Sequence, residues 1–136
     1  MKQTSLKYWI SAALLCAGAQ AAHADGIAVV MGPSAAPLSK DAVANLYLGR
    51  TFDLKPIDAP EGNALRDQFY KKLADRDASQ VKSMWSRVVF TGKGQPPIML
   101  PNAAEVKKAV ATDPKAIGYI DKSAVDASVK VVLTLD

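Results

Sequence analysis

A short run of apolar residues, Gly-Ile-Ala-Val-Val-Met at 26–31, constrains the fold more than any other segment of the chain. An unbroken apolar run of this length is typical of a strand that is buried on both faces. Such a strand needs other elements packed above and below it. The run therefore predicts a layered domain built around a central sheet.

Helical patterns separate this run from further extended segments. Apolar residues three and four positions apart indicate amphipathic helices, and the capping residues Ser39, Asp77 and Asn102 precede three of them. The segment 91–101 contains two Gly and three Pro, which predicts a loop. The expected helices lie at 39–48, at 61–74, from the cap at 77–80 through the stripe that ends at Val89, and at 102–111. The expected strands lie at 26–31, 51–57, 116–120 and 129–135.

The order of these segments is β-α-β-α-α-loop-α-β-β. Helices that alternate with strands predict an α/β domain of the three-layer type, with a mixed, mostly parallel sheet. The alternation in Val129-Lys130-Val131 predicts that the last strand lies at an edge or runs antiparallel. An apolar stripe at helical spacing predicts a buried helix face and a place in the core for Trp85. Its members are Val81, Met84, Trp85, Val88 and Val89.

The first 24 residues have the pattern of a secretory signal peptide. Lys2 and Lys7 precede an apolar stretch, and Ala22-His23-Ala24 forms a small-x-small cleavage motif. The apolar stretch is shorter than the ~20 residues that span a bilayer, which disfavours the alternative of an uncleaved anchor. We therefore expect export of a single mature domain over residues 25–136, with no membrane span after cleavage.

Cleavage of 24 residues from 136 leaves 112 and removes the single Cys and the single His of the chain. The formal charge falls from +4 to +2 with the loss of Lys2 and Lys7. The mature domain then lacks the residues for Cys–His or Ser–His catalysis and for ordinary zinc sites. Basic residues are dispersed among acidic ones, which does not predict a nucleic-acid surface. No catalytic residue, cofactor or metal is predicted.

A candidate ligand site lies at Gly62-Asn63-Ala64-Leu65-Arg66, which follows a predicted strand and opens a helix. Free amides at a helix start attract anions, Asn63 offers a donor and Arg66 a charge. A simple capped helix start is the alternative. Ser34 is a second candidate, because loops at the carboxyl ends of strands often hold ligands.

Four segments resemble the periplasmic phosphate-binding proteins of ABC transporters and their PstS-like relatives, which have the type II periplasmic binding protein fold. Glu61 to Leu65 resembles the acidic-Gly-Ser-Gly-Thr phosphate turn of that family. Pro114 to Ile120 is similar to the family's Pro-Gly-Ala-Ile-Gly-Tyr segment. The other two segments are 37–50 and Trp85 with 90–94.

The resemblance implies a periplasmic, non-enzymatic solute-binding protein with an oxyanion such as phosphate as ligand and an ABC permease or another protein as partner. The chain is long enough for about one of the family's two lobes. Asn63-Ala64-Leu65 stands where the family has Ser-Gly-Thr, and Ala59 where it has an Arg. The loss of these donors motivates a second hypothesis, a ligand-free lobe that binds another protein or forms a homodimer.

Overall fold

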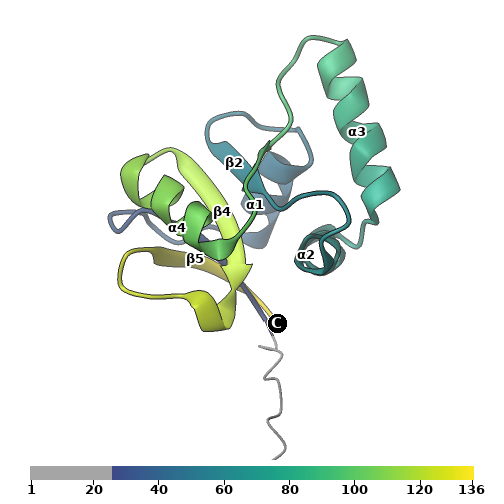
Figure 1. Ribbon diagram of the computed structural model, residues 1–136. Helices are drawn as coiled ribbons and strands as arrows, with labels where there is room; N and C mark the ends of the chain where they lie inside the picture. Colours follow the sequence, from purple (N-terminus) through teal and green to yellow (C-terminus); the bar gives the residue numbers. More distant parts are fainter. Residues whose placement is uncertain (1–25) are drawn as a thin grey trace, which may run out of the picture.

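The computed structural model describes residues 26–136, so the predicted signal peptide at 1–24 lies outside the described residues. Within this range the chain forms one sheet of five strands, four helices and a short 3₁₀ turn (Figure 1). The strands are β1 (Ile27–Met31), β2 (Lys55–Asp58), β3 (Ile98–Met99), β4 (Ala116–Asp121) and β5 (Lys130–Leu135). The helices are α1 (Lys40–Tyr47), α2 (Ala64–Ala74), α3 (Ala78–Phe90) and α4 (Ala103–Thr112), and the 3₁₀ turn is Lys122–Ala124.

The strands lie in the order β3-β2-β4-β1-β5. Strand β2 is parallel to β3 and β4, whereas β1 is antiparallel to both β4 and β5. Among the described strands, β1 therefore runs against the other four. This confirms the predicted mixed sheet, which is mostly parallel in strand direction although two of its four neighbouring pairs are antiparallel. The expectation for the last strand is also confirmed, because β5 is an antiparallel edge.

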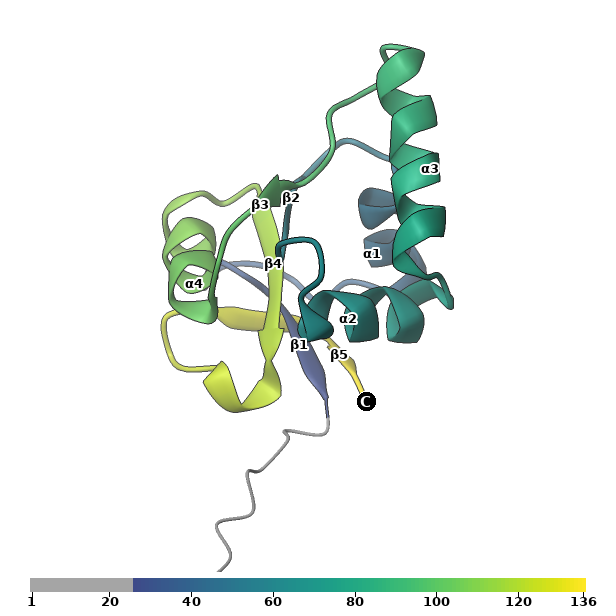
Figure 2. The same ribbon diagram turned by 45° about the vertical axis from the view of Figure 1, so that its right-hand side comes forward.

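Helices cover both faces of the sheet (Figure 2). Helices α1, α2 and α3 pack on one face, where Ile27, Val29 and Met31 point into an aromatic-rich core. Helix α4 packs on the other face, against Ala28 and Val30. Successive residues of a strand point to opposite faces, so β1 contributes to both cores. The three-layer prediction from the apolar run is thus confirmed.

The predicted caps form, with small shifts in the element ends. Ser39 Oγ accepts from the Ala42 amide, and Asp77 forms a reciprocal capping box with Gln80. Helix α2 begins at Ala64 rather than near Glu61, because Asn63 is its N-cap. The strand predicted at 51–57 begins four residues later and ends one residue later, as β2. The predicted loop at 91–101 contains the two-residue strand β3.

Helix α3 packs on the core through Val81, Trp85 and the partly buried Val88, and its far end extends beyond the rest of the domain. Val81 and Trp85 are buried, and the Trp85 indole N–H donates to the Tyr47 carbonyl at 2.8 Å, which confirms the core position of Trp85. Val89 belongs to the same predicted stripe but is 44% exposed, so that part of the prediction is wrong. The reason is that the last turns of α3 project away from the sheet (Figure 2).

A glycine allows α4 to approach β4. A Cβ atom built on Gly118 would lie 2.5 Å from Val106 Cγ1, well inside contact distance. Overpacking of this kind typically costs about 1–3 kcal/mol. We predict that Gly118→Ala lowers the free energy of unfolding by about this amount in urea denaturation. The double variant Gly118→Ala/Val106→Ala should cost less than the sum of its two single changes; strict additivity would contradict this packing.

Candidate functional site

The direction of the strands decides which candidate residues can meet. Strands β2 and β4 are parallel, so their carboxyl ends, at Asp58 and Asp121, lie at the same end of the strands. We call this end the first edge of the sheet. Strand β1 runs the other way, so Ser34, which follows it, lies at the opposite edge. Gly62, Asn63, Ala64 and Arg66 gather at the first edge, because they directly follow β2. The structure does not bring Ser34 to them.

The carboxylate of Asp58 is the centre of this edge. It is 3% exposed, and the rest of the cluster surrounds it. The Tyr70 hydroxyl donates to Oδ2 at 2.6 Å, the Tyr119 hydroxyl donates to Oδ1, and the Ala59 amide donates to Oδ1 at 2.9 Å. These donors come from α2, from β4 and from the residue after β2. A buried carboxylate is tolerated when it is paired in this way.

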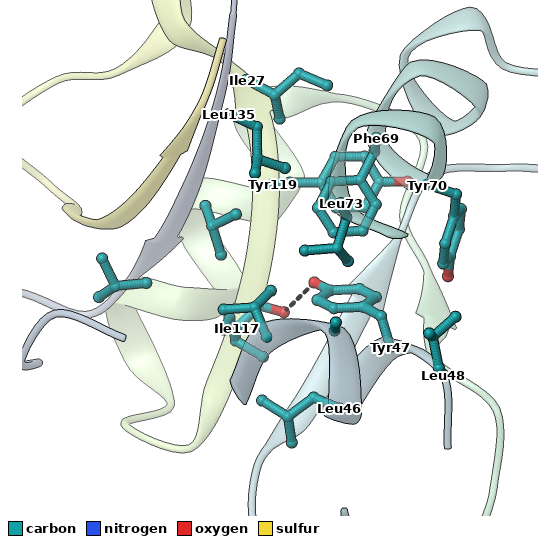
Figure 3. Packing of buried hydrophobic residues seen from close by; sticks show 14 of the residues in the cluster. Ile27, Leu46, Tyr47, Leu48, Phe69, Tyr70, Leu73, Ile117, Tyr119 and Leu135 are labelled. Carbon is teal, nitrogen blue, oxygen red and sulfur yellow. Dashed lines mark hydrogen bonds between the residues drawn. The ribbon is translucent and has the colours of Figure 1, made fainter. Parts of the chain in front are cut away.

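Aromatic rings form the wall behind the carboxylate. Phe69 stacks on Tyr119 with ring centres 3.7 Å apart, and Tyr47 meets Phe69 edge to face at 4.7 Å (Figure 3). The Tyr47 hydroxyl lies 2.8 Å from the Ile57 carbonyl oxygen and 3.2 Å from that of Ile117. It therefore connects β2 to β4 just below Asp58 and excludes water from the cluster.

Burial has the largest effect on the pKa values of Asp58, Tyr70 and Tyr119. Desolvation raises the pKa of Asp58 above its ordinary value, although the Tyr119 and Tyr70 hydroxyls and the charge of Arg66 act in the opposite direction. Burial next to Asp58 also raises the pKa of Tyr70 and that of Tyr119, so both hydroxyls stay protonated donors. The cluster is built to hold one carboxyl group and its donors away from water.

Arg66 is the cation of the site, and its contacts are weak. Its Nε lies 3.6 Å from Asp58 Oδ2 and has no hydrogen-bond partner within residues 26–136. Its Nη1 lies 3.4 Å from the Ala59 carbonyl oxygen and 3.8 Å from Met99 Sδ. The side chain is 12% exposed. The Nε atom is itself buried, so of the five N–H donors of a guanidinium only those on Nη1 and Nη2 remain for a ligand.

The turn before α2 is a well-formed helix start. Gly62 has φ +81°, a left-handed conformation that favours glycine. Asn63 Oδ1 accepts from the Leu65 amide at 2.9 Å, so this side chain caps the helix instead of presenting a donor. The other first-turn amides, those of Ala64 and Arg66, are left for solvent or an anion by this geometry. Both the capped helix start and the potential anion site are therefore present in one turn.

A groove opens beside Arg66, between the start of α2, helix α3 and strand β3. Its volume is about 510 Å³, within the range of roughly 300–1,000 Å³ that is typical of small-molecule sites. Its walls are apolar side chains such as Trp85, Phe90 and Met99, and Asp58 and Arg66 lie at its base. Asn63 and Leu65 instead line a separate pocket of about 210 Å³ next to Tyr119.

Sequence reasoning missed Asp58, Tyr70 and Tyr119 as a group. The sequence presents Asp58 only as one of several carboxylates near Glu61, and the tyrosines are 12 and 61 residues away from it. One signal was available: Asp58 ends a strand directly after the apolar residue Ile57. A charged residue at the buried end of a strand needs partners, but the sequence does not name them.

Two further properties of the described residues bear on function. Across residues 26–136, no three or more His, Cys, Asp or Glu side chains cluster in a way that could hold a metal ion. The helices of the same range are all too short or too polar to cross a bilayer.

Comparison with known proteins gives a fold. A Clostridium perfringens protein assigned as a phosphate ABC transporter substrate-binding protein, solved with bound phosphate, matches 79% of this chain with a TM-score of 0.63 and 20% identity. A phosphate transport receptor from Vibrio cholerae matches 79% with a TM-score of 0.62 and 18% identity. The chain has the fold of a lobe of these binding proteins. No protein family and no curated protein sequence matches it.

The match covers 44% of the Clostridium perfringens chain and 45% of the Vibrio cholerae chain. This chain therefore spans less than half the length of these two structures. Both are transport binding proteins. The predicted fold class, a lobe-sized α/β domain of the type II periplasmic binding protein kind, is confirmed.

The buried carboxylate predicts a pH dependence of stability. Because its folded pKa is raised, Asp58 holds its proton in the folded chain above pH 3.8, where the unfolded chain releases it. Stability should therefore fall as the pH rises from about 3.8 to the folded pKa, by about 1.4 kcal/mol for each pH unit between the two values. Urea denaturation over this range should show the fall for the wild type and lose it in Asp58→Asn.

The matched control is Asp67→Asn, which removes an exposed carboxylate from the same edge. It should keep the fall seen in the wild type. If Asp58→Asn and the wild type have parallel profiles, Asp58 is not the buried titrating group.

Proposed function

We propose that this chain is an exported, solute-binding-like protein that binds an oxyanion such as phosphate at the first turn of α2. The observation that carries the proposal is the position of Arg66 in the first turn of α2, where its Nη1 makes only long contacts and the amides of Ala64 and Arg66 have no partner within the helix. The similarity to a substrate-binding protein solved with phosphate supports it. In this proposal Gly62 allows the ligand to approach the backbone.

The expected affinity is low, in the millimolar range, for electrostatic reasons. Asp58 lies 3.6 Å from the Arg66 guanidinium and offsets part of its charge. Glu61 places a second carboxylate at the same helix start, where a free anion would otherwise gain from the helix dipole. The Asn63 side chain is already engaged as the N-cap. A partner that completes the enclosure of the ligand would raise the affinity.

The partner belongs to the proposal as well. This chain spans less than half of the length of its two structural neighbours, and the binding site has two walls in full-length members of the resembled family. We propose that the described lobe forms one of these walls. We propose a periplasmic location after signal cleavage and a second protein, such as an ABC permease, as the other wall. No enzymatic step is proposed for this site.

Calorimetric titration with inorganic phosphate, sulfate and molybdate tests the anion site. We predict weak, saturable binding by the wild type and at least a tenfold loss in Arg66→Gln, because charge-assisted hydrogen bonds contribute about 1.5–3 kcal/mol. The matched control is Arg50→Gln, an exposed arginine that does not line the groove beside Arg66. Binding that Arg66→Gln leaves unchanged, or no binding of any of the three anions, would contradict the proposal.

A second prediction concerns Glu61. The change Glu61→Gln removes a like charge from the anion's position at the helix start, a contribution of about 0.3–1 kcal/mol. Phosphate should therefore bind about two- to fivefold more tightly to this variant, and the gain should shrink at high ionic strength. Equal affinities at low salt would place the anion elsewhere.

A further inference from the structure

The groove next to Arg66 is larger and more apolar than an inorganic anion requires. It lies between α2, α3 and β3 and has a volume of about 510 Å³. Phe90 is 91% exposed, Met99 55% and Val89 44%, and all three line this groove. Large apolar side chains grouped on a surface in this way mark a binding site, because their contact with water is unfavourable.

The base of the groove has the opposite character. Arg66 lines it with a guanidinium that makes only long contacts among the described residues. Asp58 competes only weakly for the N–H donors of Arg66. Both of its carboxylate oxygens already accept hydrogen bonds, from Tyr70, Tyr119 or the Ala59 amide. Lys82 adds a second cation on the α3 side. Glu61 also lines the groove, so two cations and two carboxylates lie around its base, and the Asp58 carboxylate is already engaged by its own donors. The walls of the groove are apolar.

We propose that this groove binds an organic oxyanion, with its anionic group on Arg66 and its apolar group between α3 and β3. The proposal rests on the oxyanion function proposed above and names the class of ligand for it. The weakly engaged Nη1 of Arg66 selects the anionic group, and the apolar walls select the apolar one. Inorganic phosphate would leave Phe90, Val89 and Met99 in water, so it would use only part of the site.

A series of ligands with one head group tests the proposal. Inorganic phosphate, methyl phosphate and phenyl phosphate are titrated against the mature protein by calorimetry. We expect phenyl phosphate to bind at least tenfold more tightly than inorganic phosphate, with methyl phosphate between them. Phe90→Ser should reduce the advantage of phenyl phosphate without changing the affinity for inorganic phosphate. Phe90 is almost fully exposed, so its replacement should leave the fold intact.

The control variant is Ile98→Ser, which removes another exposed apolar side chain of β3 that does not line this groove. It should keep the full advantage of phenyl phosphate. If phosphate binds through Arg66 but phenyl phosphate binds no more tightly, the organic ligand is ruled out and the oxyanion function stands. If no member of the series binds, both fail.

Sedimentation equilibrium at the same protein concentrations tests the rival occupant. The proposal expects a monomer with an accessible groove. A wild-type dimer that Phe90→Ser converts to monomers would show that a second copy fills the groove, and this would overturn the proposal.

Discussion

The burial of one carboxylate organises this lobe. Removing the charge of Asp58 from water is costly unless donors surround it, and the donors come from Tyr119 on β4 and Tyr70 on α2. The two hydroxyls thereby tie the end of β2 to its neighbouring strand and to the helix that follows it. The position of α2 sets the position of Arg66, so the site depends on the same interaction that closes the core at this edge.

The same interaction limits the chemistry of the site. Arg66 is near a carboxylate that it cannot fully pair with, since the closest approach to Asp58 is 3.6 Å. This leaves a cation with unused donors but reduced net charge. A full-strength phosphate site would need further donors, and the turn at Asn63-Ala64-Leu65 lacks the two hydroxyl side chains of the resembled family. An organic oxyanion, whose apolar group adds contacts with the groove, fits these constraints better than a small, multiply charged anion.

Local sequence signals predicted the helices and strands well. They could not predict strand pairing or side-chain clusters that join distant parts of the chain. The caps at Ser39, Asp77 and Asn102 act within three residues, and the apolar run of β1 follows from burial on both faces. The pairing of β1 with β4 and β5 depends on residues about 100 positions apart, so sequence pattern could not separate Ser34 from the α2 site. The Asp58 cluster joins residues up to 61 positions apart for the same reason. The apolar stripe of α3 continues into its exposed end, as it would in a fully buried helix. The sequence pattern therefore could not predict that this end has no packing partner within the described domain.

Amide chemical-shift mapping on the isotopically labelled mature protein, with inorganic phosphate as the titrant, tests the central claim most directly. The account predicts that the largest changes fall on the amides of Ala64 and Arg66, with the loop around Ser34 unaffected, because the two regions lie at opposite edges of the sheet. Changes concentrated at Ser34, or uniformly small changes along the whole chain, would contradict it.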